Sequence, residues 1–182
     1  HTGTRFGYLG SIAWQKGVHV LIEAFNRLPP QASLTIYGDE RVFPQYAVRL
    51  RALVRHTQIR FAGLLDYRRV GQALRELDYL VVPSLWYENY PLVVQEAFGA
   101  GVPVIASRLG ALVERVKDGV FVCLFAPGDA DELADVLSDL LVHPELRDAY
   151  RASIRPEPTM QEHVHRLVEI YRSLLRHARA VS

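Results

Sequence analysis

The 182-residue chain has a formal net charge of +1, with 49% hydrophobic and 23% charged residues. This balance is typical of a globular domain and excludes both a disordered chain and a strongly basic nucleic-acid-binding protein. No stretch approaches the roughly 20 consecutive apolar residues that a membrane-spanning helix needs, and residues 1–4 do not resemble a signal peptide. Because the single cysteine, Cys123, cannot form an internal disulfide, we expect a cytoplasmic protein.

Short apolar segments alternate along the chain with longer stretches of helical periodicity. We expect strands at Arg5–Leu9, Ser33–Tyr37, Gln58–Phe61, Tyr79–Pro83, Val102–Ala106 and Val120–Phe125. Apolar runs with so little polar alternation are typical of parallel strands that are covered on both faces. The alternation predicts an α/β fold, with a doubly wound, Rossmann-like parallel sheet of about six strands.

Apolar residues three and four positions apart mark the predicted helices. These helices are expected over Val18–Leu28, Val48–Leu53, Val70–Leu77, Leu133–Leu141 and Met160–Leu175. Asp66 and Asp129 stand where helix caps are expected. Pro156 and Pro158 separate the last helix from the rest, so residues 1–155 are predicted to form the Rossmann-like domain and residues 156–182 its C-terminal helical arm.

The segment from Asp78 to Glu114 carries the most chemical information. A buried strand ends near Pro83, a loop follows, and a helix is predicted to begin with Pro91 in its first turn. Ligands bind beyond the carboxyl ends of the strands in such sheets, and a helix that begins there presents free N–H groups to anions such as phosphate. Two carboxylates beside a phosphate site, Glu88 and Glu96, are suited to accepting hydrogen bonds from sugar or ribose hydroxyls.

Glu88 and Glu96 are separated by seven residues within the sequence PSLWYENYPLVVQEAFGAGVPVIAS. This strand–loop–proline–helix–glycine–strand segment resembles the Glu-x7-Glu motif of the family-4, or group 1, retaining glycosyltransferases with the GT-B fold. Four further segments, residues 9–17, 36–39, 59–63 and 109–119, resemble parts of the same family in the same order. The resemblance covers nearly the whole chain, but only the C-terminal, donor-binding half of the family's GT-B fold.

The resemblance implies an enzyme of polysaccharide biosynthesis that transfers a sugar from a nucleotide-diphosphate sugar to a glycan or lipid acceptor. Transfer would proceed with retention, without a metal and without another cofactor. The acceptor would bind to an N-terminal domain that is absent here, and residues 156–182 would cross toward that domain. The isolated chain should therefore bind nucleotide but transfer little sugar, and the resemblance leaves room for peripheral membrane association of the full-length enzyme.

The same resemblance implies roles for individual residues. Lys16 and the amides of Leu92 and Val93 would hold the diphosphate, Glu88 would contact the donor sugar and Glu96 the ribose; Lys16 and Glu88 are the predicted catalytic residues. The complete predicted donor site is Gly10, Ser11, Lys16, Gly38, Arg60, Glu88, Asn89, Tyr90, Pro91, Leu92, Val93 and Glu96.

Two of these residues are assigned to the base, and one departs from the family pattern. Gly38 and Arg60 would flank the nucleotide base from the ends of their strands. The family often has an arginine where Ser11 stands, which leaves Lys16 as the main cation for the diphosphate.

Other functions fit the sequence less well. A nucleotide-sugar epimerase would need an acid/base set near the sugar, and the candidate loops offer no histidine other than His19. A dehydrogenase is disfavoured because no Gly-x-Gly-x-x-Gly follows the first strand, whereas a non-catalytic nucleotide-binding module stays open. Trp86 and Tyr87 are interpreted as packing residues in preference to platforms for a sugar ring, and residues 129–131 as a helix cap rather than a metal-binding Asp-x-Asp.

Overall fold

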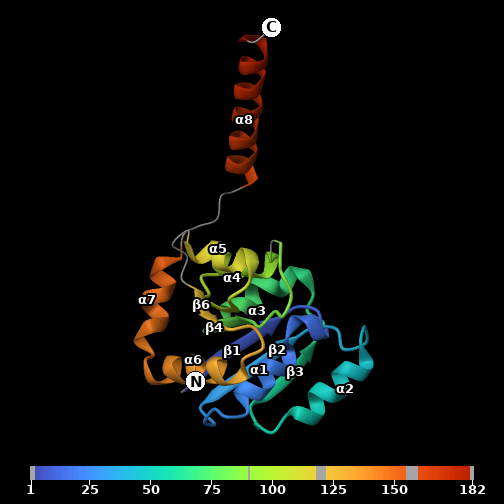
Figure 1. Ribbon diagram of the computed structural model, residues 1–182. Helices are drawn as coiled ribbons and strands as arrows, with labels where there is room; N and C mark the ends of the chain where they lie inside the picture. Colours follow the sequence, from blue (N-terminus) through green and yellow to red (C-terminus); the bar gives the residue numbers. More distant parts are fainter. Residues whose placement is uncertain (1–2, 90, 118–121, 155–159, 181–182) are drawn as a thin grey trace.

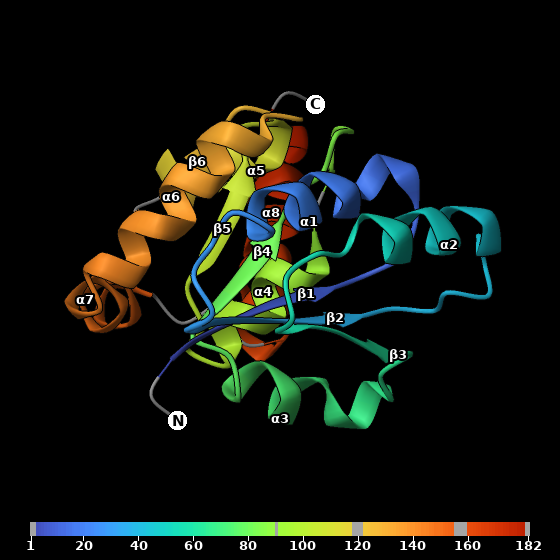
Figure 2. The same cartoon turned by 90° about the horizontal axis from the view of Figure 1, so that it is seen from below.

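The computed structural model describes residues 3–89, 91–117, 122–154 and 160–180. They form one sheet of six parallel strands in the order β3-β2-β1-β4-β5-β6 (Figure 2). The strands are β1 (Thr4–Leu9), β2 (Ala32–Tyr37), β3 (Ile59–Gly63), β4 (Tyr79–Val82), β5 (Val104–Ser107) and β6 (Val122–Phe125). The predicted doubly wound sheet is thus confirmed, and its strand order reverses between β1 and β4, where such folds bind ligands.

Helices cover both faces of the sheet. They are α1 (Val18–Phe25), α2 (Pro44–Leu53), α3 (Val70–Arg75), α4 (Leu92–Gly99), α5 (Gly110–Lys117), α6 (Ala130–Val142), α7 (Glu145–Ser153) and α8 (Met160–Ala180), with 3-10 turns η1 (Trp14–Lys16) and η2 (Tyr67–Arg69). Helices α1, α2 and α6 lie on one face, and α3 and α4 on the other (Figure 2).

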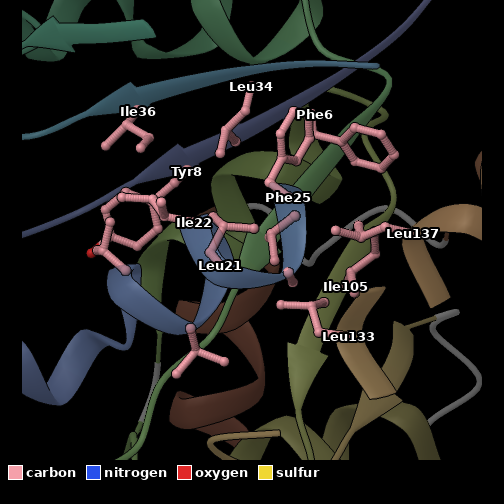
Figure 3. Close-up of a cluster of buried hydrophobic side chains, with 14 of the residues drawn as sticks. Phe6, Tyr8, Leu21, Ile22, Phe25, Leu34, Ile36, Ile105, Leu133 and Leu137 are labelled. Atoms are coloured by element: carbon pink, nitrogen blue, oxygen red, sulfur yellow. The ribbon is translucent and has the colours of Figure 1, made fainter. Parts of the chain in front are cut away.

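Strand β4 shows how the sequence produces two hydrophobic cores. All four of its residues are buried, and successive side chains of a strand point to opposite faces. Tyr79 and Val81 join the core beneath α1 and α6, which Figure 3 shows with Phe6 and Phe25 among its members. Leu80 and Val82 join the second core beneath α3 and α4. Burial on both sides fixes the position of the loop that follows β4.

Several predicted boundaries move by one to three residues. Helix α1 ends at Phe25 rather than Leu28, and β5 begins at Val104 rather than Val102. Pro91 is the N-cap of α4, with extended backbone (φ −71°, ψ 99°), so it precedes the helix rather than lying in its first turn. The predicted caps are confirmed, because the Asp66 carboxylate accepts from the Arg68 N–H and that of Asp129 from the Asp131 and Glu132 N–H groups.

A buried carboxylate ties α7 to the start of the sheet. Asp78 is only 3% exposed, and it accepts hydrogen bonds from the backbone N–H and the guanidinium of Arg5 at 2.8 to 3.2 Å. Arg147 of α7 approaches the same carboxylate at 3.3 Å. This cluster joins β1, β4 and α7 at the edge of the sheet opposite the ligand-binding edge.

Helix α8 stands away from the sheet (Figure 1). Its apolar residues are exposed by 38% to 76%: Met160, Val164, Leu167, Val168, Ile170, Tyr171, Leu174 and Leu175. The sheet of this domain therefore does not cover the apolar stripe of α8. Within the described ranges, no helix combines the length and the apolar character that crossing a membrane requires.

Candidate functional site

The loops that follow β1 and β4 meet at the point where the strand order reverses. The Leu85 N–H donates to the Gln15 carbonyl at 2.8 Å. Gly17 adopts φ +68°, and a Cβ at this position would lie 1.8 Å from the Pro83 carbonyl oxygen. Only glycine allows both this left-handed conformation and this approach, so the two loops form one wall.

Lys16 and Glu88 contact each other across this junction. Lys16 Nζ lies 2.5 Å from Glu88 Oε1, and the buried Ser84 hydroxyl donates to the same oxygen at 2.8 Å. The side chains of Lys16 and Glu88 are 32% and 18% exposed, so a ligand can reach both. Because no described residue donates to Glu88 Oε2, that oxygen can accept a hydrogen bond from a ligand.

A tyrosine beneath the first loop fixes its shape. The Tyr8 hydroxyl donates to the Ser11 carbonyl at 2.7 Å, and the Ala13 N–H donates to the same carbonyl at 2.9 Å. Burial, together with Tyr46 and Glu88 nearby, raises the pKa of Tyr8 above its ordinary value of 10.0, so this hydroxyl stays protonated. Tyr8 was not among the predicted site residues, although the sequence contains a signal for it: a hydroxyl in an apolar strand, two residues before Gly10.

Three glycines line the neighbouring part of the same edge. The Gly10 N–H donates to the Tyr37 carbonyl at 3.1 Å, and the Gly38 N–H to the Gly63 carbonyl at 2.9 Å. A Cβ on Gly38 would lie 2.3 Å from the Gly10 carbonyl oxygen, so the loops after β1 and β2 pack backbone against backbone. Gly10 and Gly38, both predicted to belong to the donor site, therefore lie close together, and Gly63, which was not predicted to belong to it, lies beside Gly38.

Arg60 is not brought to this edge. It is the second residue of β3, in register with Thr35 of β2, whereas the carboxyl end of β3 is Gly63. Its exposed side chain lines a separate groove of about 970 Å³ with residues that include Gly3 and Glu76. Arg60 lies near the amino end of β3, so it is not at the strand end that was predicted to flank the base.

Helix α4 begins at the same edge as Lys16 and Glu88. No described side chain caps its N-terminus, so the Leu92 and Val93 N–H groups point out of the helix without a side-chain acceptor. Glu96, one turn along, is partly buried, and burial raises its pKa above the ordinary value of 4.5. Asn89 is exposed, and Tyr90 lies outside the described residues.

A cavity of about 410 Å³ opens beside the Lys16–Glu88 pair, lined by Trp14, Gln15, Lys16, Trp86 and Glu88. Trp14 is 62% exposed and Trp86 is 68% exposed. Tyr87 is also 70% exposed, so the interpretation of Trp86 and Tyr87 as packing residues is wrong for this domain.

The arrangement can bind an anion and a polyol side by side. A lysine ammonium and the free N–H groups of a helix start favour phosphate groups. A carboxylate oxygen that accepts no hydrogen bond from the described residues, such as Glu88 Oε2, can accept one from a ligand hydroxyl. A molecule that carries both, such as a sugar linked to a diphosphate, fits this edge of the sheet.

The chain matches a known protein family over most of its length. Residues 3–143 match the model of the family described as "Glycosyl transferases group 1". A phosphatidyl-myo-inositol mannosyltransferase of Mycobacterium leprae is 34% identical over 144 residues, which are 76% of this chain and 37% of that protein. The chain thus spans little more than a third of the length of this curated relative.

Two solved structures are similar to the chain. Alr3699/HepE of Anabaena, in complex with UDP and glucose, aligns with a TM-score of 0.72 and 26% identity, over 84% of this chain and 42% of that one. The C-terminal domain of a glycosyl transferase group 1 family protein (LpcC) of Francisella tularensis aligns with a TM-score of 0.69 and 25% identity, over 82% and 81% of the two chains.

Proposed function

The chain belongs to the group 1 glycosyltransferases, and we propose that it is the nucleotide-sugar-binding domain of an enzyme that transfers a sugar from a nucleoside diphosphate to an acceptor. The observation that carries this proposal is the contact of Lys16 with Glu88 at the junction of the β1 and β4 loops. This contact supports the proposal, in which the Lys16 ammonium binds the diphosphate and the Glu88 carboxylate accepts from sugar hydroxyls.

Lys16 stabilises the leaving diphosphate in this proposal. Negative charge develops on the diphosphate as the glycosyl bond breaks, and fixed cations and N–H donors at such a point lower the barrier. The Lys16 ammonium and the Leu92 and Val93 amides supply them. Ser84 continues to donate to Glu88 Oε1 when Lys16 turns to the diphosphate, so Glu88 is not left without a partner.

Glu88 and Glu96 orient the two hydroxyl-bearing parts of the donor. Glu88 Oε2 accepts from the donor sugar, and Glu96 accepts from the ribose. Gly10, Ser11 and Gly38 line the nucleotide from the adjoining strand ends, with Gly63 in the place first assigned to Arg60. Asn89, Tyr90 and Pro91 complete the site before α4.

The full-length enzyme contains an N-terminal domain that binds the glycan or lipid acceptor in this proposal. The share of the relatives that the chain covers supports it. Residues 1–155 form the donor domain, and the exposed apolar stripe of α8 in residues 156–182 docks on the N-terminal domain. The isolated chain then binds nucleotide but transfers little sugar.

The proposal further includes transfer with retention of configuration, without a divalent metal, by an enzyme that is cytoplasmic and associates peripherally with the membrane. NMR of the product's anomeric carbon tests retention. Fractionation of cells that express the full-length protein tests the location.

Isothermal titration calorimetry of the chain with UDP, GDP and ADP in excess chelator tests the binding function and its metal independence together. We expect saturable 1:1 binding of at least one nucleotide. The absence of binding heat for all three, with or without added Mg²⁺ and Mn²⁺, would overturn the proposal; binding that appears only with metal would overturn its metal-free form.

A further inference from the structure

We propose that Trp14 and Trp86 form an aromatic subsite that binds a pyranose ring beside the Lys16–Glu88 pair. The inference rests on the proposed function and deepens it, because it names residues that recognise the sugar in addition to the two glutamates. Neither tryptophan is required by the fold, since 62% of Trp14 and 68% of Trp86 are exposed.

The backbone holds the two tryptophans at one cavity. The Leu85 N–H donates to the Gln15 carbonyl at 2.8 Å. Trp14 directly precedes Gln15 in the chain, and Trp86 directly follows Leu85. Both line the cavity of about 410 Å³ that Lys16 and Glu88 also line. The contact that joins the β1 and β4 loops therefore brings the two indole rings to the same opening.

Trp14 is held in place although it is exposed. Its ring stacks on His19 with 6.0 Å between centroids and 18° between planes. The Tyr46 hydroxyl of α2 lies 2.8 Å from His19 Nδ1, and it accepts from the His19 N–H at 3.3 Å. Burial lowers the pKa of His19, against a weaker opposing influence of Glu23, so the imidazole stays neutral and its Nδ1 can accept from Tyr46. The Trp14 ring is thus already held in one orientation before a ligand stacks on it, which reduces the entropic cost of binding.

The composition of the cavity favours a carbohydrate. Aromatic faces bury the apolar C–H face of a pyranose, while the Glu88 carboxylate and the Gln15 amide can bond its hydroxyls. A few polar groups set among apolar walls are typical of sites that orient a small molecule. A lipid tail would instead desolvate Lys16 and Glu88 without offering them any partner.

The ring can come from either of two sources with the same chemistry. It is the glycosyl group of the donor, or a terminal sugar of the acceptor that approaches it. The experiment therefore includes both kinds of probe.

The chain contains only these two tryptophans, so its intrinsic tryptophan fluorescence reports on this cavity alone. The probes are UDP and UDP-glucose, GDP and GDP-mannose, ADP and ADP-glucose, and maltotriose and mannotriose without nucleotide. We expect at least one sugar-bearing probe to change the emission. Trp14→Ala and Trp86→Ala should each lower the affinity for that probe about three- to tenfold, the range of an aromatic contact. Both variants should leave the affinity for the nucleotides without a sugar unchanged. The corresponding Phe variants should recover part of the lost affinity for the sugar-bearing probe.

If the tryptophan variants lose affinity only for the nucleotide sugars, the bound ring belongs to the donor. If they lose affinity only for the trisaccharides, it belongs to the acceptor. Tyr171→Ala, which removes an exposed aromatic ring of α8, should bind every probe as the wild type does. If the wild type binds UDP, GDP or ADP but neither tryptophan variant differs from it with any sugar probe, the subsite is refuted and the proposed function stands. If the wild type binds none of these three nucleotides, the proposed function itself fails.

Discussion

Lys16 Nζ lies 2.5 Å from Glu88 Oε1, although 72 positions separate the two residues in the chain. The contact depends on Gly17, which has no Cβ to collide with the Pro83 carbonyl. A local feature of the backbone thus joins a cation from the β1 loop to a carboxylate from the β4 loop. The chemistry of the proposed site follows from this junction.

Lys16→Met should weaken binding of a nucleoside diphosphate by about 1.5 to 3 kcal/mol, because a hydrogen bond to a charged group is lost. Affinity for the corresponding nucleoside, which has no phosphate, should not change. Arg49→Met removes an exposed cation of α2 and serves as the control. Calorimetry checks the prediction, and an equal loss for diphosphate and nucleoside would show that Lys16 acts through the fold rather than on the diphosphate.

Glu96→Gln should weaken nucleotide-sugar binding by about 1.5 to 3 kcal/mol and reduce its acid sensitivity. The proposed contact needs an ionised acceptor, and burial raises the pKa of Glu96 above 4.5, so this carboxylate takes up a proton at a higher pH than an exposed glutamate does. Wild-type affinity should therefore fall as the pH is lowered through this raised value. A nucleotide sugar is the suitable ligand, because it lacks the terminal phosphate that titrates near pH 6. Parallel pH profiles of the wild type and the variant would remove Glu96 from the site.

Asp78→Asn should lower the free energy of unfolding by about 3 kcal/mol, because the change leaves Arg5 and Arg147 without their buried carboxylate. Burial alone would raise the pKa of Asp78, but hydrogen bonds and charge from Arg5, with Arg147, lower it below 3.8. The stabilisation is thus fully present above pH 3.8 and is lost as the pH falls through the lower folded value. Urea unfolding measures both effects.

The matched control for Asp78 is Glu40→Gln, which breaks the 2.7 Å surface pair of Glu40 with Arg51. Exposed pairs contribute little, so its urea midpoint should stay near that of the wild type. Equal destabilisation by the two variants would contradict the structural role of the Asp78 cluster.

Asp129→Ala should cost about 1 kcal/mol of stability, the usual contribution of a helix cap, because Asp129 accepts from the Asp131 and Glu132 N–H groups. Asp131→Ala keeps both of those N–H donors and should cost less. Thermal unfolding gives the comparison. Nucleotide affinity with and without Mn²⁺ should be the same for both variants as for the wild type, and a Mn²⁺-dependent difference would restore the metal-binding interpretation of this Asp-x-Asp.

The sheet could be predicted from the sequence because strands such as Tyr79–Val82 are buried on both faces and are continuously apolar. Helix α7 could not, because none of its residues is fully buried and its position depends on Arg147 reaching Asp78 across the fold. The start of α4 was misplaced by one residue because Pro91 fits both the N-cap and the first turn.

The site was predictable where it is local and unpredictable where it is not. The loops of Lys16 and Glu88 follow two strands and could be found by position. Three features depend on contacts between distant segments and could not be predicted: the donation of Lys16 and Ser84 to one Glu88 oxygen, the hydrogen bond of Tyr8 to the first loop, and the position of Trp14 and Trp86 at one cavity. Arg60 was misassigned because the strand is predicted to end at Phe61 but extends to Gly63.

A crystal structure of the chain with a bound nucleotide sugar tests the central claim most directly. The account predicts the diphosphate within hydrogen-bonding distance of Lys16 Nζ and the Leu92 and Val93 amides, with the sugar against Glu88. A diphosphate that lies instead in the groove beside Arg60 and Glu76, with the Lys16–Glu88 pair intact, would contradict it.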